Sequence, residues 1–177
     1  MPTSSIILFA ISIILLLIYL LRTGNNVLDI RNIISQHFDI IKIDKFTLFV
    51  FTIVPITLSI GCVLVKTIDD NILDTINIAL PIYIGLQFSV IGVICSLNKG
   101  SDAYESIKEQ TFNEIMFESV ISIITLIISI VLTCIDITKL DEIICYLISF
   151  CVYCLLFNVI LNTFIVFKRL KFLFDER

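Results

Sequence analysis

Charged residues are scarce in this chain: Asp, Glu, Lys and Arg make up only 16% of its 177 residues. Hydrophobic residues make up 58%, whereas a typical soluble domain has about 45–50%. The few charges cluster between long apolar runs. This pattern excludes a single compact soluble domain and predicts a polytopic membrane protein.

Catalytic and metal-binding motifs are also missing. The sequence has no H-E-x-x-H, no G-x-S-x-G, no Walker loop and no paired histidine–carboxylate set. The single histidine, His37, has no constellation of metal ligands near it, so we expect it at the surface. Cys151 and Cys154 have C-x2-C spacing but fall in an apolar run, where cysteine behaves as a small hydrophobe. We therefore expect no enzyme, no metal site and no cofactor.

Five apolar runs are long enough to cross a bilayer, which takes about 20 helical residues. They lie at about 5–21, 46–65, 77–97, 115–136 and 143–167. We expect them to form one all-α domain over residues 1–177, a transmembrane helical bundle. The first run has no basic segment before it and no A-x-A pattern, so we interpret it as a retained span.

The positions of lysine and arginine predict the orientation. Four of the twelve lie in loop 22–45, two in loop 98–114 and four in the tail from residue 168. With the N-terminus outside, these ten face the cytoplasm, and only Lys66 and Lys139 lie outside. This predicts five spans and a cytoplasmic C-terminus. Four spans with both ends cytoplasmic fit equally well if the first run only lies on the membrane.

Two cytoplasmic segments have helical patterns. "NNVLDIRNIISQHFDIIKI" alternates apolar and polar faces, which is typical of an amphipathic helix at the interface or on a partner. Ser101 is a candidate N-cap, and no Gly or Pro follows before Asp136, so one helix is expected from about 102 to 136, extending into the cytoplasm. We assign partner docking to segments 26–41 and 102–114. In the second segment the docking residues are Asp102, Glu105, Lys108 and Glu109.

A polar line follows the fourth run at helical spacing. It consists of Glu118, Ser122, Thr125, Ser129, Thr133 and Asp136. At about 100° per residue these six side chains fall within an arc of about 80°. The line is either a helix–helix seam, because small hydroxyl residues allow close packing, or the lining of a cation-selective pore shared by several copies. A carboxylate at Glu118 either marks the membrane boundary or acts as a gate.

Two further lines predict helix packing. Small residues recur on the third run at Gly85, Ser89 and Gly92, in the small-xxx-small pattern of close helix contacts. Asn158 and Asn162 lie on one face of the fifth run, and asparagine within a membrane normally bonds to a neighbouring helix. We interpret this second line as an oligomer contact.

The layout of spans, the segment "VLDIRNIISQHFDII" and the extended helix from "SDAYESIKEQTFNE" resemble the membrane subunits of antiphage defence systems. The layout is most similar to the membrane subunit of the Kiwa system. This resemblance implies a homo-oligomer in a bacterial inner membrane that senses infection. It also implies a cytoplasmic partner that acts on phage DNA, with no direct binding of nucleic acid by this chain.

The sequence thus predicts a non-enzymatic, oligomeric inner-membrane subunit that senses or transmits a membrane disturbance to a cytoplasmic partner. Its partners are then the lipid bilayer, further copies of the chain and that protein. Alternatives from the same features are a channel that depolarises the membrane, a small transporter and an immunity protein.

Overall fold

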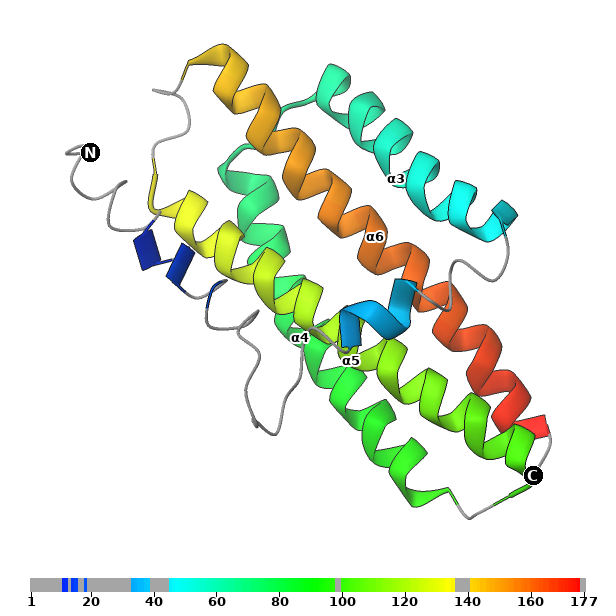
Figure 1. Cartoon of the computed structure of the whole chain (residues 1–177). Helices are drawn as coiled ribbons and strands as arrows, with labels where there is room; N and C mark the ends of the chain where they lie inside the picture. The colour runs from blue at the N-terminus through cyan, green and yellow to red at the C-terminus, as the bar shows by residue number, and fades with distance from the viewer. Residues whose placement is uncertain are drawn as a thin grey trace.

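The computed structural model describes residues 11–12, 14–15, 18, 33–38, 45–97, 100–135 and 141–175. Four long helices account for most of them (Figure 1). They are α3 (Lys45–Val65), α4 (Asp70–Ser96), α5 (Asp102–Thr133) and α6 (Glu142–Asp175). All four are long and apolar enough to cross a membrane. The described residues contain no strand, so the all-α fold of a multi-pass membrane protein is confirmed.

The helix boundaries follow local signals in the sequence. Ser101 caps α5, because its side chain accepts a hydrogen bond from the Tyr104 amide. From there α5 continues for 32 residues, about 48 Å at 1.5 Å per residue, which exceeds the hydrocarbon core of about 30 Å. Asp69 caps α4 in the same way, so that helix begins seven residues before the predicted start at residue 77. Most of the predicted first span lies outside the described residues, and so do all of residues 136–140.

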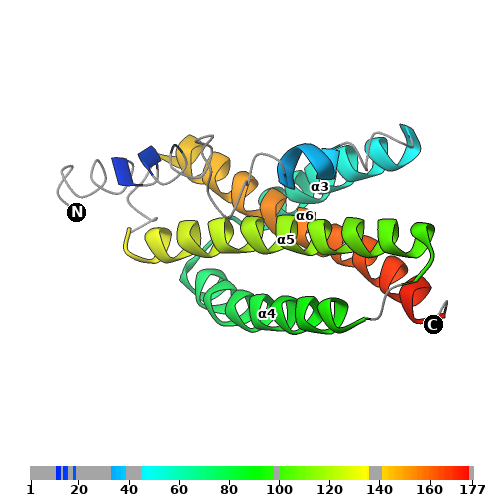
Figure 2. The same cartoon turned by 60° about the horizontal axis from the view of Figure 1, so that its bottom comes forward.

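The helices pack in the order α4, α5, α6, α3. α5 packs against α4 and α6, and α6 also packs against α3 (Figures 1 and 2). In the most apolar 18-residue stretch of α5, 44% is buried inside the bundle, whereas in the matching stretch of each other helix only 17% is buried. α5 is therefore the central helix, and the other three present much of their surface to the surroundings.

Buried apolar side chains of the described helices form three clusters, and the two larger ones hold the bundle at two levels. One cluster includes Leu73 and Leu80 of α4, Leu132 of α5 and Val152 of α6. A second cluster, nearer the C-terminal end of α6, consists of Ile94, Ile115 and Val166 with their neighbours. Polar side chains occupy the level between them, as described below.

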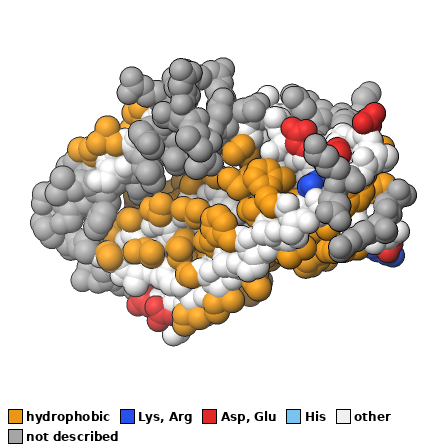
Figure 3. All heavy atoms as spheres, turned by 90° about the horizontal axis from the view of Figure 1, so that it is seen from below, with side chains coloured by type: hydrophobic (Ala, Val, Ile, Leu, Met, Phe, Trp, Pro, Cys, Tyr) orange, Lys and Arg blue, Asp and Glu red, His pale blue; other side chains and the backbone are white. Residues whose placement is uncertain are grey.

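The outer surface is apolar. Phe49, Leu64, Ile78 and Phe164 are each at least 60% exposed. Figure 3 shows hydrophobic side chains spread over much of the visible face, with acidic side chains toward the two ends. Exposed apolar area on this scale is typical of a surface that faces lipid.

Candidate functional site

The polar line of α5 points into the bundle. Glu118, Ser122, Thr125 and Ser129 are at most 1% exposed. Thr133, at the far end of the line, is exposed and accepts a hydrogen bond from Asn77 of α4 at 3.0 Å. Asp136 lies outside the described residues. The part of the line from Glu118 to Ser129 is therefore buried within one chain, and its use as an oligomer seam or pore lining stays a prediction.

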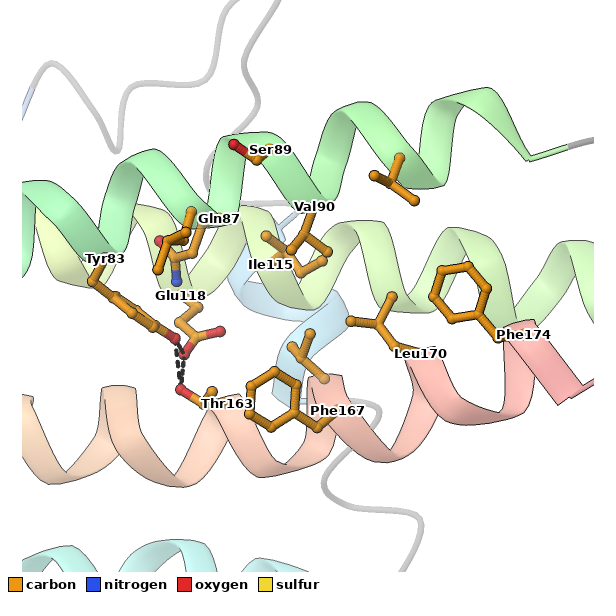
Figure 4. A pocket seen from close by; sticks show the side chains of 13 residues that line it. Tyr83, Gln87, Ser89, Val90, Ile115, Glu118, Thr163, Phe167, Leu170 and Phe174 are labelled. Atoms are coloured by element: carbon orange, nitrogen blue, oxygen red, sulfur yellow. Dashed lines mark hydrogen bonds between the residues drawn. The ribbon is translucent and has the colours of Figure 1, made fainter.

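Glu118 joins three helices. The Tyr83 hydroxyl of α4 donates to Oε1 of Glu118, and Thr163 of α6 donates to the same oxygen at 2.7 Å (Figure 4). The two hydroxyl oxygens are 2.6 Å apart. A carboxylate inside a membrane is costly unless it is paired or hydrogen-bonded. The two hydroxyls meet this requirement, and Oε1 of Glu118 links α4, α5 and α6 as their shared acceptor.

Gln87 lies one turn after Tyr83 on α4 and is only 5% exposed. Its side-chain carbonyl accepts a hydrogen bond from Ser119 at 3.0 Å. Its amide nitrogen points toward Glu118 (Figure 4) but completes no hydrogen bond with any described residue. Gln87 thus adds a second polar link between α4 and α5, and a donor without a partner in the described part of the chain.

A second carboxylate, Glu114, lies one helical turn before Glu118 and is fully buried. Its Oε2 atom is 2.8 Å from Nδ1 of His37, and its Oε1 atom is 4.0 Å from Nη1 of Arg169. The His37 ring also stacks on Phe117, with ring centroids 3.6 Å apart. These contacts hold the helical segment 33–38 against α5, and Glu114 also links α5 to α6 through Arg169.

The expectation of a surface histidine is wrong. His37 is 5% exposed, because it packs between a buried carboxylate and an aromatic ring. Gln36 adds to the same contact by accepting a hydrogen bond from Asn113 of α5. The rest of the predicted amphipathic segment, apart from residues 33–38, lies outside the described residues.

The predicted docking residues gather at the start of α5. Asp102, Glu105, Lys108 and Glu109 all line a pocket of about 500 Å³ beside the end of α4. Lys108 donates to the Leu97 carbonyl at 2.8 Å, and Glu105 accepts from the Gly100 amide at 3.0 Å. These two side chains hold the α4–α5 turn, whereas Asp102 and Glu109 are exposed. Docking of a partner here stays a prediction.

The small residues of α4 do not pack against another described helix. Gly85, Ser89 and Gly92 are exposed, and no atom of another described helix lies within 4 Å of a Cβ built at either glycine. α4 packs instead through a stripe of larger side chains that includes Leu73 and Ile94. The interhelical packing expected at this line is therefore absent from the described fold.

The asparagine line of α6 is divided. Asn162 is buried, at 1% exposure. Asn158 is half-buried and donates to the Cys154 carbonyl of its own helix at 2.8 Å, and it bonds to none of the other described helices. An oligomer contact through this line stays a prediction.

A pocket of about 400 Å³ lies between α4 and α6 beside Glu118. Its walls are mainly aliphatic and aromatic, from Val90 and Val93 of α4 to Phe167, Leu170 and Phe174 of α6 (Figure 4). No group of three or more His, Cys, Asp or Glu side chains gathers to hold a metal ion within the described ranges. The site therefore offers hydrogen bonds and an apolar cavity.

Sequence patterns missed Tyr83, Gln87, Thr163 and Arg169 as partners of the two carboxylates. The sequence contains one weak signal for these four residues, because each places a polar group in or beside an apolar run. Comparison of the chain with protein-family models, with curated proteins and with solved structures finds no match.

Proposed function

We propose that the chain is a membrane subunit that transmits a disturbance of the bilayer to a cytoplasmic protein partner. The observation that carries this proposal is the position of two buried carboxylates one turn apart on α5. Glu118 joins the three packed helices beside a pocket within the spans. Glu114 joins α5 and α6 to segment 33–38.

The coupling between the membrane-facing helices and segment 33–38 follows from the free-energy cost of burying these two carboxylates. A buried carboxylate keeps its partners only while the helices that supply them keep their spacing. A change in bilayer thickness or lateral pressure acts first on α4 and α6, whose outer faces carry exposed apolar side chains such as Ile78 and Phe164. Because α5 lies between them, a shift at Glu118 is carried along the same helix to the contact between Glu114 and His37.

A disulfide trap tests this coupling. The hydrogen-bonded pair Gln36 and Asn113 is replaced by cysteines (Gln36→Cys, Asn113→Cys) in a chain whose six native cysteines are changed to serine or alanine. In vesicles of matched lipid the pair should oxidise rapidly. Lipids with shorter acyl chains should slow its oxidation, because displacement of α4 and α6 moves segment 33–38 away from α5.

A matched control comes from the other end of α5. Asn77 and Thr133 are also hydrogen-bonded, but they link α4 and α5 far from segment 33–38. Because Thr133 lies at the opposite end of α5 from Asn113, oxidation of the Asn77→Cys, Thr133→Cys pair should slow less with shorter acyl chains than oxidation of the pair at residues 36 and 113. Equal slowing of both pairs would mean general loosening of the bundle and would refute specific transmission to segment 33–38.

We assign the partner surface to segment 33–38 and the exposed start of α5. Reversal of charge at Asp102 and Glu109 should abolish co-purification of the partner without loosening the α4–α5 turn, because Glu105 and Lys108 make that turn. Retention of the complex would remove the docking assignment. A homo-oligomer and a role in antiphage defence, which the resemblance to the Kiwa membrane subunit implies, belong to the same proposal. Particle size in detergent tests the oligomer.

Cation conduction is a second candidate, and one observation favours it. Among the described residues, the side-chain oxygens of Ser122 and Ser129 are buried on the polar line of α5 without a hydrogen-bond partner. Buried unpaired polar groups are commonly satisfied by water. Reconstituted protein should then conduct cations, with selectivity altered by Glu118→Gln. Planar bilayers that stay silent across a range of voltages would eliminate this candidate.

A further inference from the structure

The pocket beside Glu118 is a groove with one polar end and a long apolar course. On α6 it runs from Thr163 to Phe174, which is about 16 Å along the helix. On α4 it runs in the same direction, from Tyr83 to Val93. Its length is therefore about half of the hydrocarbon core, the depth of one leaflet.

The groove opens on surface that belongs to the spans. Leu86 and Phe167 line it and are 59% and 60% exposed. α4 and α6 each pack on α5, which forms the floor through Ile115 and Glu118. The polar atoms of Glu118 and Gln87 are buried in the walls. A chain of methylene groups fits such a surface, because burial of each one gains free energy without leaving a polar group unpaired.

A positively charged side chain lies near the Phe174 end of the groove, opposite the polar end at Glu118. From the helical angle, Lys171 lies about 80° from the centre of the groove-lining face of α6, and Lys168 lies about 140° away. Both side chains are exposed. Lys171 is thus placed to meet an anionic headgroup beside Phe174, whereas Lys168 points elsewhere. Arg169 is already used by Glu114.

We propose that this groove binds one acyl chain of an anionic phospholipid, with the phosphate at Lys171 and the chain end at Tyr83 and Glu118. The inference rests on the proposed transmission of bilayer disturbance and gives it a ligand. A bound chain covers the side of the Glu118 junction that faces the membrane. When lipid packing is disturbed and the chain leaves, water gains access to the carboxylate and its hydroxyl partners.

Photo-cross-linking tests the site. The full chain is reconstituted in vesicles of equal parts phosphatidylcholine and phosphatidylglycerol, with a trace of phosphatidylglycerol that carries a diazirine on its acyl chain. Mass spectrometry should find adducts concentrated on Val90, Val93 and Leu170. Val93→Phe should reduce them about tenfold, the factor expected from excluding about two methylene groups. Ile82→Phe, on the exposed surface of the same helix outside the groove, should leave them unchanged.

A second measurement does not depend on filling the groove. Lys171→Gln should abolish the preference of the adducts for phosphatidylglycerol over a phosphatidylcholine probe with the same chain, and Lys168→Gln should keep it. Adducts spread evenly over exposed helices would overturn the proposal, and so would a groove cross-link to a second copy or to another segment of this chain. If the disulfide trap between residues 36 and 113 still responds to lipid while the groove takes no adduct, only the lipid site fails.

Discussion

Removal of the Tyr83 hydroxyl probes the junction at Glu118 with the least change of shape. Tyr83→Phe deletes one donor to the carboxylate, and Thr163→Val deletes the other. Hydrogen bonds between membrane helices average about 0.6 kcal/mol and reach about 1.7 kcal/mol. Because either hydroxyl alone still serves Oε1 of Glu118, we expect each single change to cost about 1 kcal/mol of unfolding free energy.

The double variant should cost more than the two single variants together. Without either hydroxyl, the buried carboxylate has lost both donors, and an uncompensated acidic side chain at the centre of a span costs about 2.5–3.5 kcal/mol. The expected coupling free energy is therefore about 1 kcal/mol beyond additivity, above the roughly 0.3–0.5 kcal/mol scatter of independent sites. The four proteins of this double-mutant cycle are the unchanged chain, the two single variants and the double variant. The unfolding free energy of each is measured by reversible unfolding in mixed micelles, followed by the circular dichroism of the helices.

Two matched substitutions show whether the effect belongs to the junction. Tyr146→Phe removes a hydroxyl from an exposed residue of α6, and Thr75→Val removes one that bonds only within its own helix. Each should change the unfolding free energy by no more than about 0.5 kcal/mol. Additive losses at Tyr83 and Thr163 would refute the idea that one carboxylate holds the three helices.

Three further changes test other contacts. His37→Phe keeps an aromatic ring on Phe117 but removes a hydrogen-bond partner of buried Glu114, so it should cost about 1–3 kcal/mol and speed hydrogen exchange over residues 33–38. Ser101→Ala removes the α5 cap and should cost about 0.5–2 kcal/mol, seen as faster exchange at residues 102–106. The side chain of Lys66, 2.7 Å from Asp69, lowers the pKa of that exposed carboxyl. This contribution to stability is present above pH of about 4 and is lost as pH falls through the lowered pKa; Asp69→Asn should remove that part of the acid dependence of unfolding.

Hydropathy and helix-stop signals were sufficient to predict the four described spans. The length of α5 was predictable because no Gly or Pro interrupts it between its Ser101 cap and Cys134. Its polar arc was predictable as well, because helical periodicity depends only on spacing along one segment. These features are local, and a single sequence contains the information for them.

The partners of the arc depend on tertiary packing, which local patterns do not encode. Tyr83 and Thr163 are 35 and 45 residues from Glu118, and His37 is 77 residues from Glu114. The small-residue line at Gly85 has no packing partner among the described helices for a related reason. α4 carries two stripes that can pack, and burial of large side chains such as Leu73 favours the other one.

The two glutamates of α5 differ in what their partners require. The partners of Glu118 are neutral hydroxyls. The side-chain amide oxygen of a glutamine would also accept hydrogen bonds from them, so the junction at Glu118 does not depend on a full negative charge. Glu114 instead faces a histidine and the guanidinium of Arg169, which is always protonated. Removal of that charge leaves a half-buried cation without its counter-ion, and an isolated charge costs more than a lost neutral hydrogen bond. Glu118 is thus suited to a contact that opens and closes with the bilayer, and Glu114 to a contact that keeps segment 33–38 in place until α5 moves.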